Sequence, residues 1–409
     1  MRTGRPWVLV GQGWAALAAA MGVGRFVYTP ILPLMHEQAG LSRQAGADLA
    51  TANYVGYLVG AVIMILVPRL TRSVAAFRAS MLVLAGSLAL MPTSTSVPVW
   101  AELRCVAGVT SGLVFISAAG ALLAGLREHR HHLVGWGFGG VGAGIALSGV
   151  LLLVLRENGN WQEAWWCSAV LVLLGAALAW TLPMPGAPAP AASPDAAGRP
   201  GRGFAVLVTS YSLEGFGYIV AGTFLVAAVD QHAAAWVGTG AWVVVGIAAI
   251  PSAVLWAGLA RRWSRPSLLV AALALQVVAV LLPVLFDGAP AALISAALYG
   301  GTFLGIVVTT LAIGNHLGTT GAVAFLTTGY SVGQILGPVT VAPLLHGGYR
   351  PALALSAAVV AASALAAAAL PTQHPQGGPS SADDVQALRG SGLRPTRPQE
   401  CDQIDHPEN

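Results

Sequence analysis

The stretch Ser267-Leu-Leu-Val-Ala-Ala-Leu-Ala-Leu-Gln-Val-Val-Ala-Val-Leu-Leu-Pro-Val-Leu-Phe286 decides the class of fold. It contains no charged side chain, and Arg261, Arg262 and Arg265 stand just before it. The hydrocarbon core of a bilayer is about 30 Å thick and needs roughly 20 mostly apolar residues of helix to cross it. The stretch therefore predicts a transmembrane helix.

Eleven further apolar segments bring the predicted number of spans to twelve. The twelve are residues 10–35, 46–68, 74–92, 98–125, 132–155, 163–183, 203–229, 235–259, 267–286, 290–315, 319–346 and 350–370. A stretch rich in Pro, Ala and Gly divides them and predicts a flexible linker, and the polar C-terminal end predicts a disordered tail. We expect an all-α integral membrane protein with an N-terminal six-helix bundle over 1–183, a cytoplasmic linker over 184–202, a C-terminal six-helix bundle over 203–370 and a disordered cytoplasmic tail over 371–409.

The composition of the whole chain excludes a soluble protein. Of its 409 residues 56% are hydrophobic and 9% are charged, whereas a soluble domain carries about 25% charged residues. The net charge of +4 comes from arginines spread from loop to loop, while a nucleic-acid-binding protein would gather them on one face. Cys105, Cys167 and Cys401 form neither a disulfide framework nor a metal-ligand spacing.

Arginine placement predicts the orientation of the spans. Cytoplasmic loops carry an excess of Lys and Arg, so the side with more arginines is expected to be the cytoplasm. A cytoplasmic N-terminus assigns to the inside Arg2, Arg5, Arg69, Arg72, Arg78, Arg127, Arg130, Arg199, Arg202, Arg261, Arg262 and Arg265. It leaves outside only Arg43, Arg156 and Arg350. Both termini are therefore expected in the cytoplasm.

The first span imitates a signal peptide, because Arg2 and Arg5 precede an apolar run that ends in Leu17-Ala-Ala-Ala20. A cleaved peptide normally precedes a soluble chain, but one apolar segment after another follows here, so we interpret the run as the first transmembrane helix. The lack of lysine and the excess of Ala, Gly and Arg are typical of GC-rich bacterial genomes. We therefore expect a multi-pass protein of the bacterial cytoplasmic (inner) membrane.

The two halves of the chain show a repeat. Gly24-Arg-Phe-Val-Tyr28 in the first span aligns with Glu214-Gly-Phe-Gly-Tyr218 in the seventh, Phe with Phe and Tyr with Tyr, at about equal depth. Transporters built from repeats place the binding site near the bilayer midplane, at the interface of the repeats. The alignment therefore directs attention to these two helices.

Several blocks resemble one family of transporters. The plan of six plus six spans resembles the major facilitator superfamily, and Gly22-Val-Gly-Arg-Phe-Val-Tyr-Thr-Pro-Ile-Leu-Pro-Leu-Met35 resembles the signature of its YbfB/YjiJ-type subfamily. Residues 50–57, 212–219 and 333–338 resemble the same subfamily, and the likeness covers about residues 10–370. The resemblance implies two pseudo-symmetric six-helix bundles and a secondary transporter.

Two superfamily motifs are altered or partial. Arg104-Cys-Val-Ala-Gly108 is similar to the R-x-x-x-G pattern that the family associates with proton coupling. Residues 257–265 resemble the loop motif G-x-L-A-D-R-x-G-R, but Arg261 stands where the family has Asp, and residues 68–72 lack that Asp as well. The gating salt bridge that the family attributes to this motif is therefore not expected here.

Arg25 is the charge placed deepest in an apolar span. An arginine at a helix centre costs about 2.5–3.5 kcal/mol and normally faces a cavity or a partner. Tyr28 lies beside it, and Pro30 and Pro33 are expected to break the helix after it. Two interpretations stay open. The guanidinium binds a carboxylate or other anion of the substrate, for which its fork of donors is suited, or it forms an ion pair with Glu214 that locks the two halves together.

Glu214 is the only acidic residue placed well inside a span, among Leu213, Phe216 and Ile219. Such a carboxyl is a candidate for proton exchange. Either it couples transport to protons, with a partner that alternates between substrate and Arg25, or it forms a static salt bridge.

Other polar side chains complete the candidate site. The resemblance makes Arg104 a proton-relay candidate, and an arginine that snorkels to the interface is the alternative; Glu102 is two residues away and points to another face. Asn53 and Tyr57 share a face of span two. The remaining candidates are Tyr218, Asn315 and Gln334. Each of the uncharged ones alone is more often an interhelical hydrogen bond.

The glycines and histidines predict helix packing and a loop rather than a binding or catalytic site. Gly142 and its neighbours in span five, Gly333 and its neighbours in span eleven, and Gly56 in span two predict close helix packing. Although Gly137-Phe-Gly-Gly-Val-Gly142 matches G-x-G-x-x-G, it follows no strand, so it is no nucleotide fingerprint. His129-Arg-His-His132 lacks helical metal-ligand spacing. We interpret it as a basic cytoplasmic turn and expect no metal and no cofactor.

The sequence thus favours a secondary active transporter that moves a small organic solute, with a lean to carboxylates or other anions, by alternating access coupled to protons. No Walker sequence is present, and no enzymatic activity is expected. The alternatives are a polytopic membrane enzyme and a transporter-like sensor. The expected partners are the small-molecule substrate, protons and the lipid bilayer, with no nucleic acid, and the chain is expected to act as a monomer.

Overall fold

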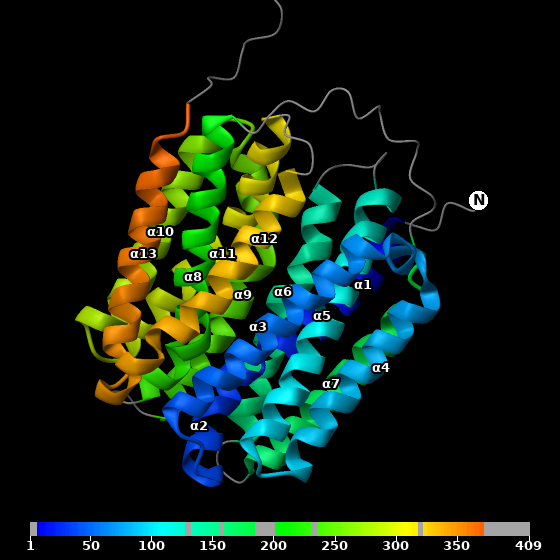
Figure 1. The fold of residues 1–409 in the computed structure, drawn as a ribbon, viewed down its shortest axis with the longest axis vertical. Coiled ribbons are helices and arrows are strands. Elements are labelled where there is room, and N and C mark those ends of the chain that lie inside the picture. Colours follow the sequence, from blue (N-terminus) through cyan, green and yellow to red (C-terminus); the bar gives the residue numbers. More distant parts are fainter. Residues whose placement is uncertain are drawn as a thin grey trace, which may run out of the picture. The chain divides into compact units, whose positions relative to one another are not determined.

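The structure is a computed structural model that describes residues 6–126, 132–155, 159–184, 201–230, 235–317 and 322–371. Within these ranges the chain is helical and contains no β-strand (Figure 1). These described residues belong to one compact unit. The predicted all-α membrane fold is confirmed. The linker and the tail predicted from the sequence fall almost wholly outside the described residues.

The N-terminal bundle is built from six spans. The first consists of α1 (Pro6–Leu17), the π-helix η1 (Ala18–Arg25) and α2 (Tyr28–Ala39). The others are α3 (Arg43–Leu66), α4 (Val74–Leu90), α5 (Val97–Gly125), α6 (His132–Leu155) and α7 (Trp161–Ala179), with the short 3-10 helices η2 (Pro68–Arg72) and η3 (Met91–Thr93) between them.

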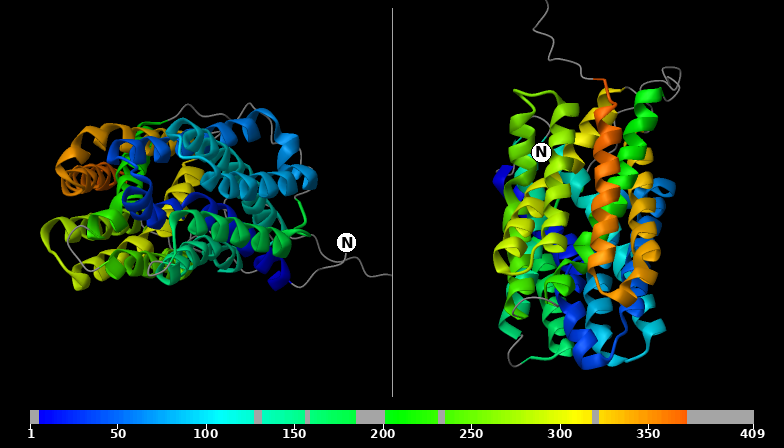
Figure 2. Two further views of the ribbon diagram at one scale, coloured as in Figure 1. Left: turned by 90° about the horizontal axis from the view of Figure 1, so that it is seen from below. Right: turned by 90° about the vertical axis from the view of Figure 1, so that its left-hand side faces the viewer.

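The C-terminal bundle follows the same plan. Its helices are α8 (Arg202–Asp230), α9 (Ala235–Leu259), α10 (Arg265–Leu285), α11 (Ala289–His316), α12 (Ala322–Val341) and α13 (Arg350–Ala368), with the 3-10 helix η5 (Ala342–Gly347) after α12. Among the described residues, eleven helical segments are long and apolar enough to cross a membrane. The helix α12 corresponds to the predicted eleventh span and packs along α8. Figure 2 shows the helices standing side by side along a common direction.

Polar residues fix several helix starts. Ser42 Oγ accepts a hydrogen bond from the Ala45 backbone N–H at 3.1 Å, and Ser73 Oγ accepts one from Ala76 at 3.1 Å. At the start of α7, Asn160 and Glu163 each accept a backbone N–H of the other, at 2.8 and 3.1 Å. Such caps are worth about 1 kcal/mol each because they satisfy N–H groups that the helix leaves free.

Small residues bring the two bundles into contact. α6 packs on α9, α3 on α12 and α2 on α8. A Cβ atom added to Gly142 of α6 would lie 2.6 Å from the Gly246 carbonyl oxygen of α9. Within the C-terminal bundle, Gly333 of α12 brings its helix equally close to α8, since a Cβ there would lie 2.9 Å from the Phe216 nitrogen. The predicted role of these glycines in close packing is confirmed.

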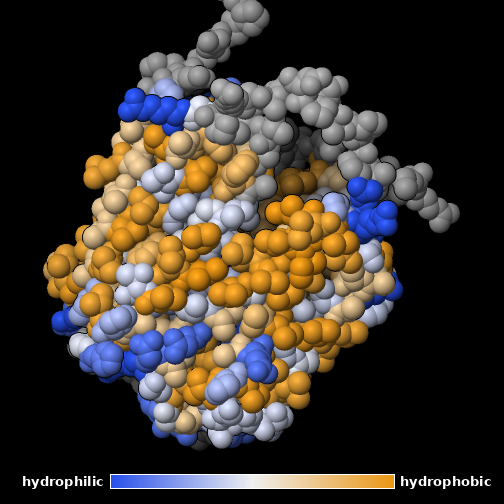
Figure 3. Space-filling view, in the orientation of Figure 1, coloured by the Kyte–Doolittle hydropathy of each residue, from blue (hydrophilic) through white to orange (hydrophobic). Residues whose placement is uncertain are grey.

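The exterior of the helices is apolar. Leu66, Val154 and Leu365 are 74%, 73% and 75% exposed, and large hydrophobic side chains cover much of the face in Figure 3. A soluble protein rarely exposes an apolar surface of this extent. The exposed side chains therefore face the lipid.

Candidate functional site

The first span changes its helical form in the middle of the bundle. Residues Ala18–Arg25 form a π-helix, and the Phe26 N–H donates to the Met21 and Val23 carbonyls at its end. π-helical turns are rare and often mark functional sites. The sequence placed the break after Arg25, at Pro30 and Pro33. The helix is interrupted directly after Arg25, at Phe26 and Val27, so only the position at the prolines is wrong. Both prolines lie within α2, and the interruption precedes them. The helix tolerates Pro30 because this residue falls in the first turn of α2, where a missing N–H costs nothing.

Arg25 lies at the end of this π-helix, between the two bundles. It is 3% exposed, and its Nη2 donates to Gln334 Oε1 of α12 at 2.7 Å. The guanidinium carbon lies 4.2 Å from the centre of the Tyr57 ring and 5.1 Å from that of Tyr54. Its Nε has no hydrogen-bond partner. Arg25 is thus held by aromatic rings of its own bundle and one neutral amide of the other.

Arg104 forms hydrogen bonds to the backbone at the helix break. Its Nη1 and Nη2 donate to the carbonyls of Gly24 and Arg25 at 3.3 and 3.0 Å, and Asn53 Nδ2 donates to the Arg104 carbonyl at 2.9 Å. Its guanidinium lies 5.0 Å from the centre of the Tyr28 ring. Arg104 is 1% exposed, which contradicts the alternative that it snorkels to the interface, while its candidacy as a proton relay stays a prediction. Its bonds hold the backbone that carries Arg25.

Glu214 lies inside the C-terminal bundle and does not reach Arg25. It is 1% exposed, and its Oε1 accepts a hydrogen bond from Gln276 Nε2 of α10 at 3.4 Å, while its Oε2 has no partner. The predicted ion pair between Arg25 and Glu214 is therefore wrong for this structure. The physical reason is helix geometry: Glu214 points toward α10, and Gln334 on α12 is the side chain presented to Arg25. Sequence reasoning missed Gln276.

A layer of aromatic rings accompanies Glu214. Tyr218 stacks on Tyr299 and Phe303 of α11, with ring centres 5.3 and 4.6 Å apart, and Tyr211 stacks on Tyr330 of α12 at 4.4 Å. The Tyr299 hydroxyl donates to the Tyr218 carbonyl at 2.8 Å. The Tyr330 hydroxyl is buried without a partner. These rings fill the core of the bundle on the Glu214 side of α8.

A set of bonds joins the bundles from the level of Arg25 to the end where α2 finishes and α3 begins; we call this set the latch. Thr29 Oγ1 donates to the Gly222 carbonyl and Tyr54 Oη bonds Thr223 Oγ1, both at 2.7 Å. The remaining bonds are His36 Nε2 to Tyr349 Oη at 2.9 Å and Arg43 Nη1 to the Leu345 carbonyl at 3.2 Å.

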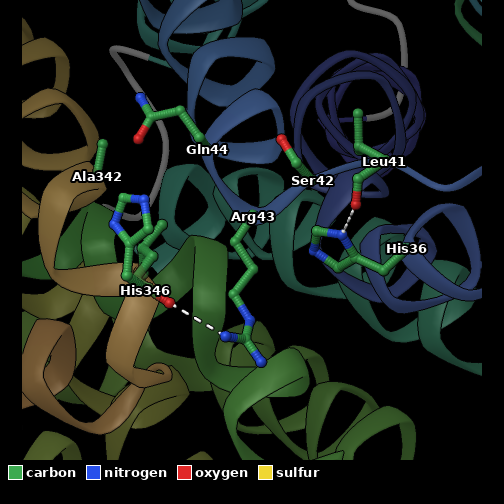
Figure 4. Close-up of a pocket in the computed structure, with 8 residues that line it drawn as sticks. His36, Leu41, Ser42, Arg43, Gln44, Ala342 and His346 are labelled. Carbon is green, nitrogen blue, oxygen red and sulfur yellow. Dashed lines mark hydrogen bonds between the residues drawn. The ribbon is translucent and has the colours of Figure 1, made fainter.

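The hydrogen bonds of the latch determine the tautomer of His36. The Leu41 carbonyl can only accept, so Nδ1 of His36 carries the hydrogen of their bond, and Nε2 accepts from the Tyr349 hydroxyl. Burial raises the pKa of Tyr349 to about 12, so this hydroxyl keeps its proton at physiological pH. A pocket of about 440 Å³ opens beside these residues, and Figure 4 shows His36, Arg43 and His346 around it.

Comparison with known proteins agrees with this architecture. The family model described as "Uncharacterised MFS-type transporter YbfB" matches residues 17–368. The chain belongs to this family. A crystal structure of a mutant of the nucleoside transporter NupG superposes with a TM-score of 0.72 over 89% of this chain and 99% of that one, at 10% identity, and so shares the fold. No curated protein matches the chain.

The protein is therefore a secondary transporter of the major facilitator superfamily and a multi-pass membrane protein. Both its family and its fold are those of transporters rather than enzymes. The match to the YbfB-type model confirms the resemblance derived from the sequence blocks.

The transporter arranges the predicted site residues in three groups. Arg25, Tyr57 and Gln334 meet at the bundle boundary. Arg104, Asn53 and Tyr28 surround the back of the helix break, where the Tyr28 hydroxyl donates to the Gly46 carbonyl at 2.8 Å. Glu214 and Tyr218 lie in the C-terminal bundle. Asn315 is exposed near the end of α11, apart from all three groups.

Among the described residues no group of His, Cys, Asp or Glu could hold a metal ion. His129, Arg130 and His131 lie outside the described residues, so the interpretation of this turn stays a prediction.

Proposed function

We propose that the protein moves a small organic solute that carries a carboxylate or other anionic group across a bacterial inner membrane, by alternating access coupled to the proton gradient. The observation that carries this proposal is Arg25. It is a buried cation at a helix break, it is bonded to the opposite bundle, and that bond is to a neutral amide rather than to a carboxylate.

Arg25 keeps the capacity to bind an anion. Its Nε is unpartnered, and the rings of Tyr54 and Tyr57 stabilise its charge by cation–π contact without neutralising it. A guanidinium in a membrane protein that lacks a protein counter-ion is costly. An anionic substrate group would supply that counter-ion and replace the amide of Gln334.

The contacts between the bundles support alternating access. The latch closes one end, while Figure 3 shows the surface hollowed near the upper end of the view, between the two bundles. The arginine bias assigns the cytoplasm to the end opposite the latch. We therefore propose that the latch lies at the outer end and that both termini lie in the cytoplasm.

Glu214 supports proton coupling. It is an acidic group in the core of a bundle, and among the described residues no cation contacts it. Burying a carboxylate with neither counter-ion nor full hydrogen bonding is unfavourable. A proton that binds and leaves during the cycle would account for a carboxyl at this position.

The test uses purified protein in two steps. A thermal-stability screen against mono- and dicarboxylates selects the best stabiliser, and flux of that compound is then measured in proteoliposomes with an acid outer medium. We expect flux that collapses with a protonophore. Arg25→Lys keeps the charge but loses the fork, and we expect it to reduce flux at least about tenfold.

Arg78→Lys is the matched control, because Arg78 also binds a carbonyl, that of Trp180, but at the surface. Flux that ignores the protonophore would rule out proton coupling. Carboxylates that stabilise Arg25→Lys as well as the natural protein would rule out the anion site.

A further inference from the structure

The carboxyl group of Glu214 has an amide as its partner. Gln276 on α10 is 0% exposed, and among the described residues its Nε2 supplies the one hydrogen bond that Glu214 receives, at 3.4 Å. Gln276 Oε1 and Glu214 Oε2 are both buried and unpartnered. Two polar side chains therefore meet in an apolar core with one oxygen of each left without a partner.

Within the part of the chain that the structure describes, no charged group competes for this carboxyl. Four tyrosines are close enough to interact with its charge: Tyr211 and Tyr218 from α8, Tyr299 from α11 and Tyr330 from α12. α9 contains no titratable residue, and α10 and α13 carry only their first residues, Arg265 and Arg350. α13 packs on this side of α8 through serines and alanines. Gln276 is thus the partner that decides how Glu214 is held.

An amide can serve both protonation states of a carboxyl. Its N–H donates to a carboxylate, and after rotation its carbonyl oxygen accepts from the O–H of a carboxylic acid. An arginine or lysine could only donate and would hold the charged form, while an apolar residue would serve neither. In the present arrangement Nε2 of Gln276 faces Glu214, and Oε1 has no hydrogen-bond partner. A half-turn of the amide would let Oε1 accept from the O–H of a protonated Glu214 without any movement of a helix.

We propose that Gln276 is the positioning residue of the coupling site: it holds the Glu214 carboxyl in both protonation states and sets the pH at which the proton is exchanged. This inference rests on the proposed function, in which Glu214 carries the proton. It makes the coupling site a property of the C-terminal bundle alone, separate from Arg25.

A contact path leads from this site to Arg25. Tyr211 stacks on Tyr330 at 4.4 Å, Tyr218 lies 6.3 Å from Tyr330, and Gln334 lies one turn further along α12. Gln334 is the residue that binds Arg25 across the bundle boundary. A change at Glu214 that moves α12 would therefore alter the bond between Gln334 and Arg25.

Infrared titration of the purified protein tests the proposal without a substrate. The C=O band of protonated Glu214 is identified by its loss in Glu214→Gln and followed against pH. We expect Gln276→Met to move the midpoint about one pH unit upward, because the donor favours the carboxylate more than the acid. The C=O band should also move to higher frequency, as it does for a carboxyl without a hydrogen bond.

Ser295→Ala is the matched control. Ser295 is buried and donates to the Ala279 carbonyl of α10 at 2.6 Å, so its loss removes a bond of the same helix without touching Glu214. The proposal is overturned if Gln276→Met leaves the midpoint in place, or if Ser295→Ala moves it equally. Should Gln276→Met fail to fold, Gln276→Glu keeps size and polarity, and we expect a larger upward shift because two adjacent carboxyls resist joint ionisation.

Flux measurements separate this inference from the proposed function. Proton-driven flux that is lost in Glu214→Gln, together with an unmoved midpoint in Gln276→Met, rejects the role of Gln276 and leaves the transporter proposal standing. Flux of the natural protein that ignores both pH and protonophore rejects the proposed coupling itself.

Discussion

At the scale of single residues, Arg104 explains how Arg25 can be presented at a helix break. A π-helix that ends within the membrane leaves carbonyls without their usual partners, and no water reaches them in an apolar core. Arg104 donates to two of these carbonyls, those of Gly24 and Arg25. These two bonds fix the backbone from which the Arg25 side chain extends.

Replacing Arg104 with Gln should therefore destabilise the protein. We expect the free energy of unfolding to fall by about 2–4 kcal/mol, because each buried carbonyl left unpaired costs about 1–3 kcal/mol. Denaturation in detergent micelles measures the change. Arg78→Gln, which removes two bonds to the exposed Trp180 carbonyl, should cost under about 1 kcal/mol. Equal losses in the two variants would contradict this account.

The residue scale also shows what the sequence could and could not reveal. Arg25, Arg104 and Glu214 were recognisable because charge inside an apolar span is expensive and therefore stands out. Gln276 lies in the apolar stretch 267–286, and a single neutral amide there gives no such signal. The partner of Glu214 depends on which face of α10 turns inward, and that is decided by packing rather than by composition.

At the scale of helices, the pair α6 and α9 forms an extensive contact between the bundles. The approach depends on glycine: a Cβ on Gly142 would lie 2.6 Å from the Ile250 nitrogen, and a Cβ on Gly139 would lie 2.7 Å from the Ile250 carbonyl oxygen. Both distances are shorter than side chains tolerate. In the alternating-access cycle that we propose, the bundles would move against each other along the contact between α6 and α9.

Gly142→Val should separate α6 from α9 and reduce flux by at least about tenfold, since a branched side chain cannot fit between two backbones. Proteoliposome flux and the melting temperature measure the effect. Gly86 is the control: nothing lies within 4 Å of a Cβ added there. Gly86→Ala should stabilise α4 by up to about 1 kcal/mol and leave flux unchanged. Normal flux in Gly142→Val would show that transport does not depend on the close approach of α6 and α9.

Helix positions were largely predictable, because about twenty apolar residues in a row admit few structures other than a span. The glycine faces of α3, α6 and α12 were also anticipated. The π-helix Ala18–Arg25 was not, since Gly22 and Gly24 permit the distortion but do not require it. A Cβ on Gly22 would lie 2.6 Å from the Val141 carbonyl oxygen, so packing against α6 accompanies a distortion that the local sequence leaves open.

At the scale of the whole transmembrane unit, the latch determines which end is closed. Its bonds join α2 and α3 to the end of α8, to η5 and to Tyr349, at the lower end of Figure 1. Three of these bonds join neutral groups, and the fourth runs from Arg43 to the Leu345 carbonyl. Each is worth about 1 kcal/mol, so together they can hold one state yet still break during a cycle.

Tyr349→Phe removes the tyrosine hydroxyl from the latch. The ring can remain against Arg43, whose guanidinium lies 5.6 Å from its centre, but the hydroxyl that donates to His36 Nε2 is lost. Losing about 1 kcal/mol should raise the population of the latch-open state roughly fivefold. Spin labels at Gln44 and Gly347, which are exposed and belong to opposite bundles, report it as a longer distance in pulsed electron resonance on a cysteine-free background. Tyr299→Phe serves as the control, because it removes a tyrosine hydroxyl within one bundle and should leave the distances unchanged. Identical distance distributions for Tyr349→Phe and the natural protein would show that this bond does not hold the closed state.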